Sequence, residues 1–230
     1  MAKQSPNQID VYLEAGKKRT FAGAIDWPGW CRSGPTEEAA LQALVEYGPR
    51  YARSLEGFVP GFQAPVETSH LNVVQRLDGN ATTDFGAPDL PPALDSRPVS
   101  EEELRLFQKF LEASWRAFAV AVKLAEGKEL RKGPRGGGRE LEAIARHVLD
   151  SHEGYLGALG WKAKKWGAAG LGQQIDLALQ EDREALAASA CGEIPAVGPR
   201  GGARWSPRYF VRRAAWHILD HAWEIEDRIL

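Results

Sequence analysis

The residues with the clearest capacity for chemistry are two histidines near the C-terminus, His217 and His221. They lie four residues apart in a segment with helical periodicity, so both side chains project from one helix face, about 6 Å apart. Two neutral imidazoles in this arrangement can bind one divalent ion such as Zn²⁺. The pair alone does not establish a metal site, because two polar residues on the flank of a helix have the same spacing.

A third ligand can come from an earlier helical segment, which contains His147 and His152. If that helix and the last one are the second and fourth helices of an up-down-up-down bundle, they run parallel. Counted from the helix starts at about 1.5 Å per residue, His147 then lies level with His217, and His152 level with His221. Either histidine therefore has a depth at which it could complete the site.

The helical wheel separates these two candidates by their angular position. His152 lies near the centre of the apolar stripe of its helix, whereas His147 lies on the edge of that stripe. On the last helix His217 and His221 are also displaced from the centre. A site at the seam between two helices needs ligands on the flanks, so the angular position favours His147 and leaves His152 as the alternative.

A helical scaffold is needed to hold these side chains, and residues 96–230 predict one. Four segments with apolar residues at three- and four-residue steps start near Ser100, Gly138, Gly172 and Ser206. Ser100 and Glu103 match a capping box, and Ser206 followed by Pro207 is a strong helix-start signal. Four helices of about 20 residues are typical of an antiparallel bundle.

A different module is predicted for residues 1–95. Two runs rich in β-branched and aromatic residues, 9–16 and 19–26, predict a hairpin, and residues 26–34 after it predict a loop. A further predicted strand, 71–77, can join the sheet of this hairpin.

The helix predicted for this module has Thr36 as its N-cap and is expected to end or kink at Pro49. Much of 57–98 is rich in Pro, Gly and Asp and is typical of a linker. The predicted fold class is therefore α+β. A small α/β module with a short antiparallel sheet is followed by an up-down-up-down four-helix bundle.

Composition excludes several classes of protein. The 230 residues carry a net charge of −2, without the basic balance of a nucleic-acid-binding domain. No apolar run approaches the roughly 20 residues of a membrane span, and the N-terminus lacks the apolar core of a signal peptide. We therefore expect a cytoplasmic protein without membrane or nucleic-acid partners. In that compartment Cys31 and Cys191 are not expected to form a disulfide.

Two stretches carry a resemblance to a known superfamily. LEAIARHVLDSHEGYL (141–156) and, about 60 residues later, WHILDHAWEIEDR (216–228) resemble the DinB-like metal-binding four-helix bundles, over residues 99–230. The resemblance implies that His147, His217 and His221 are the metal ligands. The superfamily includes mycothiol-dependent maleylpyruvate isomerase and the bacillithiol transferases, in which a low-molecular-weight thiol binds the metal and attacks an electrophile.

The N-terminal part, over residues 9–56, resembles a HicB-like module. FAGAIDWPGWCRSGPTEEAALQAL (21–44) looks like that family's strand, its Pro-Gly loop with an aromatic residue or cysteine, and its T-x-E-A helix start. HicB antitoxins usually append a DNA-binding segment. No helix-turn-helix or basic ribbon pattern is present here, so the resemblance does not imply DNA binding.

Three imidazole ligands leave at least one coordination position open, which is typical of a catalytic ion. Zinc is the preferred expectation for such ligands, and nickel or iron would also fit. Asp150, Asp220 and Glu224 are candidates to accept a hydrogen bond from a ligand's second ring nitrogen.

Two functions from different classes follow from these observations. The first is a metal-dependent transferase, or a hydrolase, that uses a low-molecular-weight thiol or another small-molecule substrate. The alternative is a non-catalytic protein whose ion stabilises the bundle and whose N-terminal module mediates association, for example as a homodimer. No catalytic nucleophile or general base is evident in the sequence, so neither function assigns catalytic residues.

Overall fold

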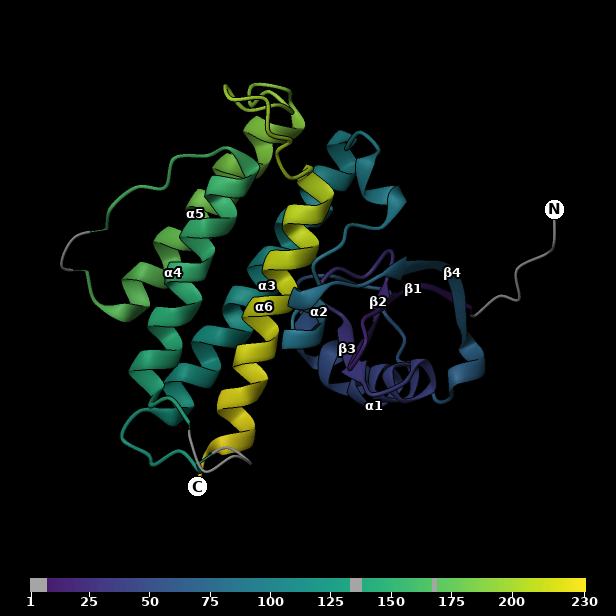
Figure 1. Cartoon of the computed structure of the whole chain (residues 1–230). Coiled ribbons are helices and arrows are strands. Elements are labelled where there is room, and N and C mark those ends of the chain that lie inside the picture. Colours follow the sequence, from purple (N-terminus) through teal and green to yellow (C-terminus); the bar gives the residue numbers. More distant parts are fainter. Residues whose placement is uncertain (1–7, 133–137, 167–168) are drawn as a thin grey trace. The chain divides into compact units, whose positions relative to one another are not determined.

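The computed structural model describes residues 8–132, 138–166 and 169–230 of the chain. The chain divides into two compact units, Met1–Arg97 and Pro98–Leu230, so the boundary lies two residues beyond the expected one. The first unit contains a four-stranded sheet and the second contains four long helices, which makes the protein α+β (Figure 1).

The sheet of the first unit is mixed, with the strand order β3-β2-β1-β4. Its strands are β1 (Ile9–Ala15), β2 (Thr20–Ala24), β3 (Cys31–Gly34) and β4 (Leu71–Asp78). β1 and β2 form the predicted antiparallel hairpin, and β4 joins β1 as expected for residues 71–77.

Two expectations for this sheet are wrong. β4 pairs with β1 in parallel, so the sheet is not purely antiparallel. The segment from β2 to β4 contains a helix and is long enough to cross over, which parallel pairing requires. Residues 31–34, expected to be loop, form β3 against β2. Their sequence, Cys-Arg-Ser-Gly, has little β-propensity, so pairing with a neighbouring strand determines this element.

α1 (Glu37–Leu55) begins at the predicted cap, where the Thr36 side chain accepts a hydrogen bond from the backbone N–H of Ala39. The helix continues past Pro49, so of the two expected outcomes at this residue, an end or a kink, the end does not occur. Packing on both sides of the proline offsets the lost backbone hydrogen bond, since α1 supplies buried residues along its whole length. The short helix α2 (Ala81–Phe85) and two 3-10 turns, Thr68–His70 and Ala93–Ser96, complete the unit.

Four helices make up the second unit: α3 (Glu101–Ala125), α4 (Leu141–Leu159), α5 (Leu171–Ala190) and α6 (Pro207–Arg228). The predicted Ser100–Glu103 capping box is present, and the Ser206 hydroxyl caps α6 ahead of Pro207. α4 starts three residues after the glycine near which it was expected. It ends at Gly160, whose φ of 99° suits glycine. None of the described helices is long and apolar enough to cross a membrane.

The four helices pack in pairs, α3 and α4 each against both α5 and α6, around an apolar core. Glu103 and Arg208 pair near the starts of α3 and α6, and Leu130 bridges to Ile229 just beyond their ends, so these two helices are parallel. At the other seam, the backbone N–H of Trp205, before α6, bonds to Ala158 near the end of α4. α4 and α6 are therefore antiparallel.

The expected up-down-up-down order is thus wrong for helices α4 and α6. α5 runs in the same direction as α4, because Arg146 and Gln174 line one hollow near their starts and His152 meets Asp182 farther along (Figure 1). α4 and α5 are joined by residues 160–170, of which 167 and 168 lie outside the described part of the chain.

Candidate metal centre

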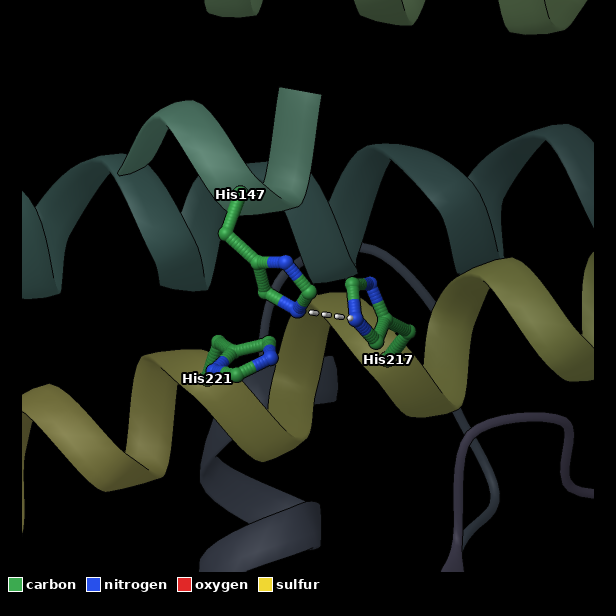
Figure 2. Close-up of side chains that lie close together, drawn as sticks. All are labelled: His147, His217 and His221. Carbon is green, nitrogen blue, oxygen red and sulfur yellow. Dashed lines mark hydrogen bonds between the residues drawn. The ribbon is translucent and has the colours of Figure 1, made fainter. Parts of the chain in front are cut away.

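The structure brings together the three histidines that the sequence singles out, at the seam between α4 and α6. His147 projects from α4, and His217 and His221 project from α6 toward it (Figure 2). One potential ligand atom from each residue lies within 4.8 Å of the other two. The pair on α6 is one helical turn apart, as the i, i+4 spacing requires.

The rings of the three histidines contact one another edge to face. Ring centroids are 5.2 Å apart for His147 and His217, 4.9 Å for His147 and His221, and 4.7 Å for His217 and His221. The Nε2 atoms of His147 and His217 lie 3.3 Å from each other. Without an ion, one of these two nitrogens must carry the proton that the other accepts.

Glu224, one turn beyond His221 on α6, orients that imidazole through a hydrogen bond to one of its ring nitrogens. The Nδ1–H of His221 donates to Oε2 of Glu224 over 2.7 Å, which leaves its Nε2 lone pair for a ligand bond. Arg228 in turn donates to the other oxygen of Glu224 over 2.8 Å. This hydrogen bond to His221 and the charge of Arg228 lower the pKa of Glu224 and keep it an acceptor.

The environment of His147 and His217 favours their neutral forms. Burial, together with the nearby His221, lowers the pKa of His217 well below its usual value, and the side chain is only 7% exposed. Burial also lowers the pKa of His147, although less deeply. Metal ligation requires unprotonated imidazole, so both side chains are in the form that binds an ion.

The donor set fits a divalent ion. Two nitrogens bound to one tetrahedral zinc at roughly 2.0–2.1 Å lie about 3.3 Å apart. The Nε2 atoms of His147 and His217 have this separation. The ligand atoms of all three histidines lie within 4.8 Å of one another, so the His221 ring would have to move closer to bind the same ion. Three neutral nitrogens and a carboxylate hydrogen-bonded to one of them are the common composition of zinc sites with an open position.

His152, the alternative third ligand, lies elsewhere. It is 1% exposed, with Nε2 3.2 Å from Oδ1 of Asp182 on α5 at an angle outside hydrogen-bond geometry. The Trp115 ring contacts it edge to face, and Trp115 Nε1 donates to Oδ2 of Asp182 over 2.7 Å. His152 is therefore a core residue, in agreement with its place at the centre of the apolar stripe.

The carboxylates that were expected to accept hydrogen bonds from the metal ligands differ in whether they contact a histidine. Glu224 contacts a ligand directly, as described above. Asp150 is exposed and acts on His147 only through its charge, which raises that pKa slightly against the stronger lowering effects. Cys31 is buried in the first unit and Cys191 is exposed in the second, and neither forms a disulfide.

Sequence reasoning missed two neighbours of the cluster, Tyr155 and Arg213. The Tyr155 ring lies 5.5 Å from that of His217, edge to face, and the Arg213 guanidinium lies 5.2 Å from the Tyr155 ring. The signal was present, because Arg213 is four residues before His217 and Tyr155 is eight residues after His147. Both spacings return to the same helix face.

Comparison of the chain with protein families, with curated proteins and with solved structures gave no match. The histidine geometry is therefore the main ground for any assignment of function.

Proposed function

We propose that the second unit is a DinB-like metal-binding bundle in which His147, His217 and His221 hold one divalent ion with an open coordination position. The observation that carries the proposal is the convergence of the three ligand atoms within 4.8 Å. The buried, neutral state of His217 and the orientation of His221 by Glu224 support it. The resemblance of 141–156 and 216–228 to that superfamily is consistent with the same three residues.

The proposed activity is transfer of a low-molecular-weight thiol to a small electrophile. The bound ion would supply a Lewis acid that stabilises the thiolate at neutral pH. The chain itself supplies three imidazoles, a carboxylate that accepts a hydrogen bond from Nδ1 of His221, and an arginine that donates to the same carboxylate. Zinc is the proposed metal because imidazole ligands suit it, with nickel and iron as the next choices.

A structural ion is the second candidate function. The site joins α4 to α6 through side chains, so an ion bound there would stabilise the bundle without any reaction. In this case the first unit, whose strands, loop and helix at 21–44 resemble a HicB-like module, would carry the function as an association module. The two candidates agree on the metal and differ only in chemistry.

Metal analysis of purified protein tests the shared part. We expect about one equivalent of zinc, nickel or iron per chain after dialysis against buffer, and none in a His217→Ala/His221→Ala double variant whose helical circular dichroism is unchanged. Absence of metal from the wild type after incubation with each of the three ions would overturn the proposal. So would full retention of metal by the double variant.

A thiol-consumption assay separates the two candidates. Metal-loaded protein, a mycothiol or bacillithiol analogue and a small electrophile are mixed, and loss of free thiol is followed over time. If the protein is a transferase, the rate of thiol loss rises in proportion to the concentration of metal-loaded protein, and the double variant gives no acceleration. Equal rates with and without loaded protein, across a panel of electrophiles, would favour the structural ion.

A further inference from the structure

Arg213 lies beside the histidine cluster, one turn before His217 on α6. The side chain is only 8% exposed. Its Nη1 is fully buried and has no hydrogen-bond partner within residues 8–132, 138–166 and 169–230. Over the same residues no carboxylate forms an ion pair with it. A buried guanidinium with an unused donor is costly, because a lost hydrogen bond is not replaced by water.

Aromatic rings hold this guanidinium in place. Its Cζ lies 4.6 Å from the ring centroid of Trp216 and 5.2 Å from that of Tyr155. Trp205 extends the same wall, with its ring 5.3 Å from that of Tyr155. Cation–π contacts stabilise the charge of Arg213 through the faces of the rings, but they leave the N–H donors in its plane unused.

Arg213 and the candidate metal ligand His217 both contact the ring of Tyr155. The centroid of this ring lies 5.2 Å from the Arg213 guanidinium and 5.5 Å from the His217 ring, and the charge of Arg213 contributes to the lowered pKa of His217. Arg208, one turn earlier on the same helix, is the contrasting case, since its guanidinium donates to the Glu103 carboxylate. The second unit thus supplies a carboxylate to Arg208 and none within the described residues to Arg213.

We propose that Arg213 binds the carboxylate of the small molecule that reaches the metal centre, so that the site selects thiols or electrophiles carrying a carboxylate a few bonds from the reacting atom. A guanidinium matches a carboxylate with two parallel N–H···O bonds, which gives both affinity and orientation. The aromatic wall limits solvent competition for this pair. The inference rests on the proposed metal function, because the metal fixes the other end of the ligand.

Cobalt-loaded protein tests this inference through spectroscopy. Co²⁺ replaces the resident ion, and thiolate binding is read from the sulfur-to-cobalt charge-transfer absorbance during titration. The probes are 3-mercaptopropionate and its neutral analogue 3-mercapto-1-propanol. We expect the wild type to prefer the carboxylate by roughly 10–100-fold, the usual contribution of hydrogen bonds to charged groups.

Variants of Arg213 separate its role from metal chelation by the probe. In Arg213→Gln the preference for 3-mercaptopropionate is expected to fall by at least about 10-fold, and Arg213→Lys is expected to retain part of it. Arg208→Gln is the matched control on the same helix and should keep the wild-type ratio. The cobalt ligand-field spectrum of each variant shows whether the bundle and the histidine site are intact.

Failure of this inference differs from failure of the proposed function. If the wild type binds no cobalt, the metal proposal itself fails. If cobalt and both thiols bind, but the affinity ratio is the same in wild type, Arg213→Gln and Arg208→Gln, then Arg213 is not a carboxylate site and its role is packing between aromatic rings. If Arg213→Gln loses cobalt but Arg213→Lys retains it, the lysine variant becomes the test of the inference. If its affinities for both thiols, and hence their ratio, equal those of the wild type, the inference is overturned.

Discussion

Two side-chain clusters in the same bundle, one of three histidines and one with a single histidine, show what distinguishes a candidate metal site from a polar core. At the α4–α6 seam His147, His217 and His221 face one another, with the nearest carboxylate behind His221. Between α3, α4 and α5, His152 instead faces the Asp182 carboxyl, which an indole N–H also contacts. In the first cluster ring nitrogens from three histidines converge on one point, whereas in the second a single imidazole faces one carboxyl group.

Burial and pKa do not separate these clusters. His217 and His152 are both buried, and burial lowers the pKa of both side chains. The difference lies in what the ring nitrogens face, which depends on residues from two helices at the seam and from three helices in the core. A lowered histidine pKa is therefore a sign of desolvation, and only the convergence of lone pairs indicates a ligand set.

The largest expected effect is on metal affinity at the seam. His147→Ala removes one of three ligands and should weaken zinc binding by roughly 100–1,000-fold, since a bound structural zinc gains on the order of 3–4 kcal/mol per ligand. His152→Gln should change the affinity by less than about 3-fold. Competition with a chromogenic chelator measures both. Equal losses in the two variants would show that the seam is not the site.

The next largest effect is on stability in the core cluster. Asp182→Ala removes the acceptor of Trp115 Nε1 and leaves a cavity, so the free energy of unfolding should fall by about 3 kcal/mol. Asp182→Asn keeps a carbonyl oxygen for the indole and should lose distinctly less. Urea denaturation of the metal-free proteins gives both values. Identical losses for Ala and Asn would mean that the Trp115 hydrogen bond contributes little.

The residues of the seam could be predicted from sequence, although one premise of that prediction is wrong. His147 was matched to His217 by depth in parallel helices, but α4 and α6 are antiparallel. The two histidines are nevertheless level, because His147 lies eleven residues before Ala158 on α4 and His217 lies twelve residues after Trp205, and the backbone of Trp205 bonds to that of Ala158. The flank position of His147, by contrast, depends only on helical periodicity and was a sound argument.

Other features depend on contacts that no local pattern contains. The caps at Thr36, Ser100 and Ser206 are local hydrogen bonds and were predictable. The parallel pairing of β4 with β1 and the direction of α5 depend on long connections, whose path the sequence does not specify. The Asp182 contact with His152 likewise crosses helices, so only the structure reveals why His152 is unsuited to an ion.

A smaller effect should follow from the carboxylate behind the seam. Glu224→Gln keeps an acceptor for His221 Nδ1–H but removes its charge, so zinc affinity should fall by about 10-fold, at the lower end of the range for such partners. Glu226→Gln, on the exposed side of α6, is the control and should have no effect. The same chelator competition applies. An unchanged affinity in Glu224→Gln would show that the charge of Glu224 does not influence the site.

The core cluster is also expected to give stability a pH dependence. Burial raises the pKa of Asp182 well above its usual value and lowers the pKa of His152 to about 3. The Asp182 contribution to stability is complete below about pH 3.8 and is lost as the pH rises through its folded pKa. The His152 contribution is complete above about pH 6.5 and is lost as the pH falls toward its folded pKa.

These dependences oppose each other at acidic pH, because the folded pair keeps its proton on Asp182 while the unfolded pair carries its proton on His152. Above about pH 6.5 the unfolded pair holds no proton, so the free energy of unfolding should fall with pH wherever folded Asp182 is still protonated, by at most about 1.4 kcal/mol per pH unit. Urea denaturation from pH 6 to 9, with chelator present, measures this slope as the difference between wild type and Asp182→Asn. Because the seam histidines are the same in both proteins, their titration drops out of that difference. If the free energy of unfolding depends on pH in the same way in the two proteins, Asp182 does not retain a proton in the folded state. The contrast between a protonated core carboxyl and the unprotonated histidines of the seam would then be lost.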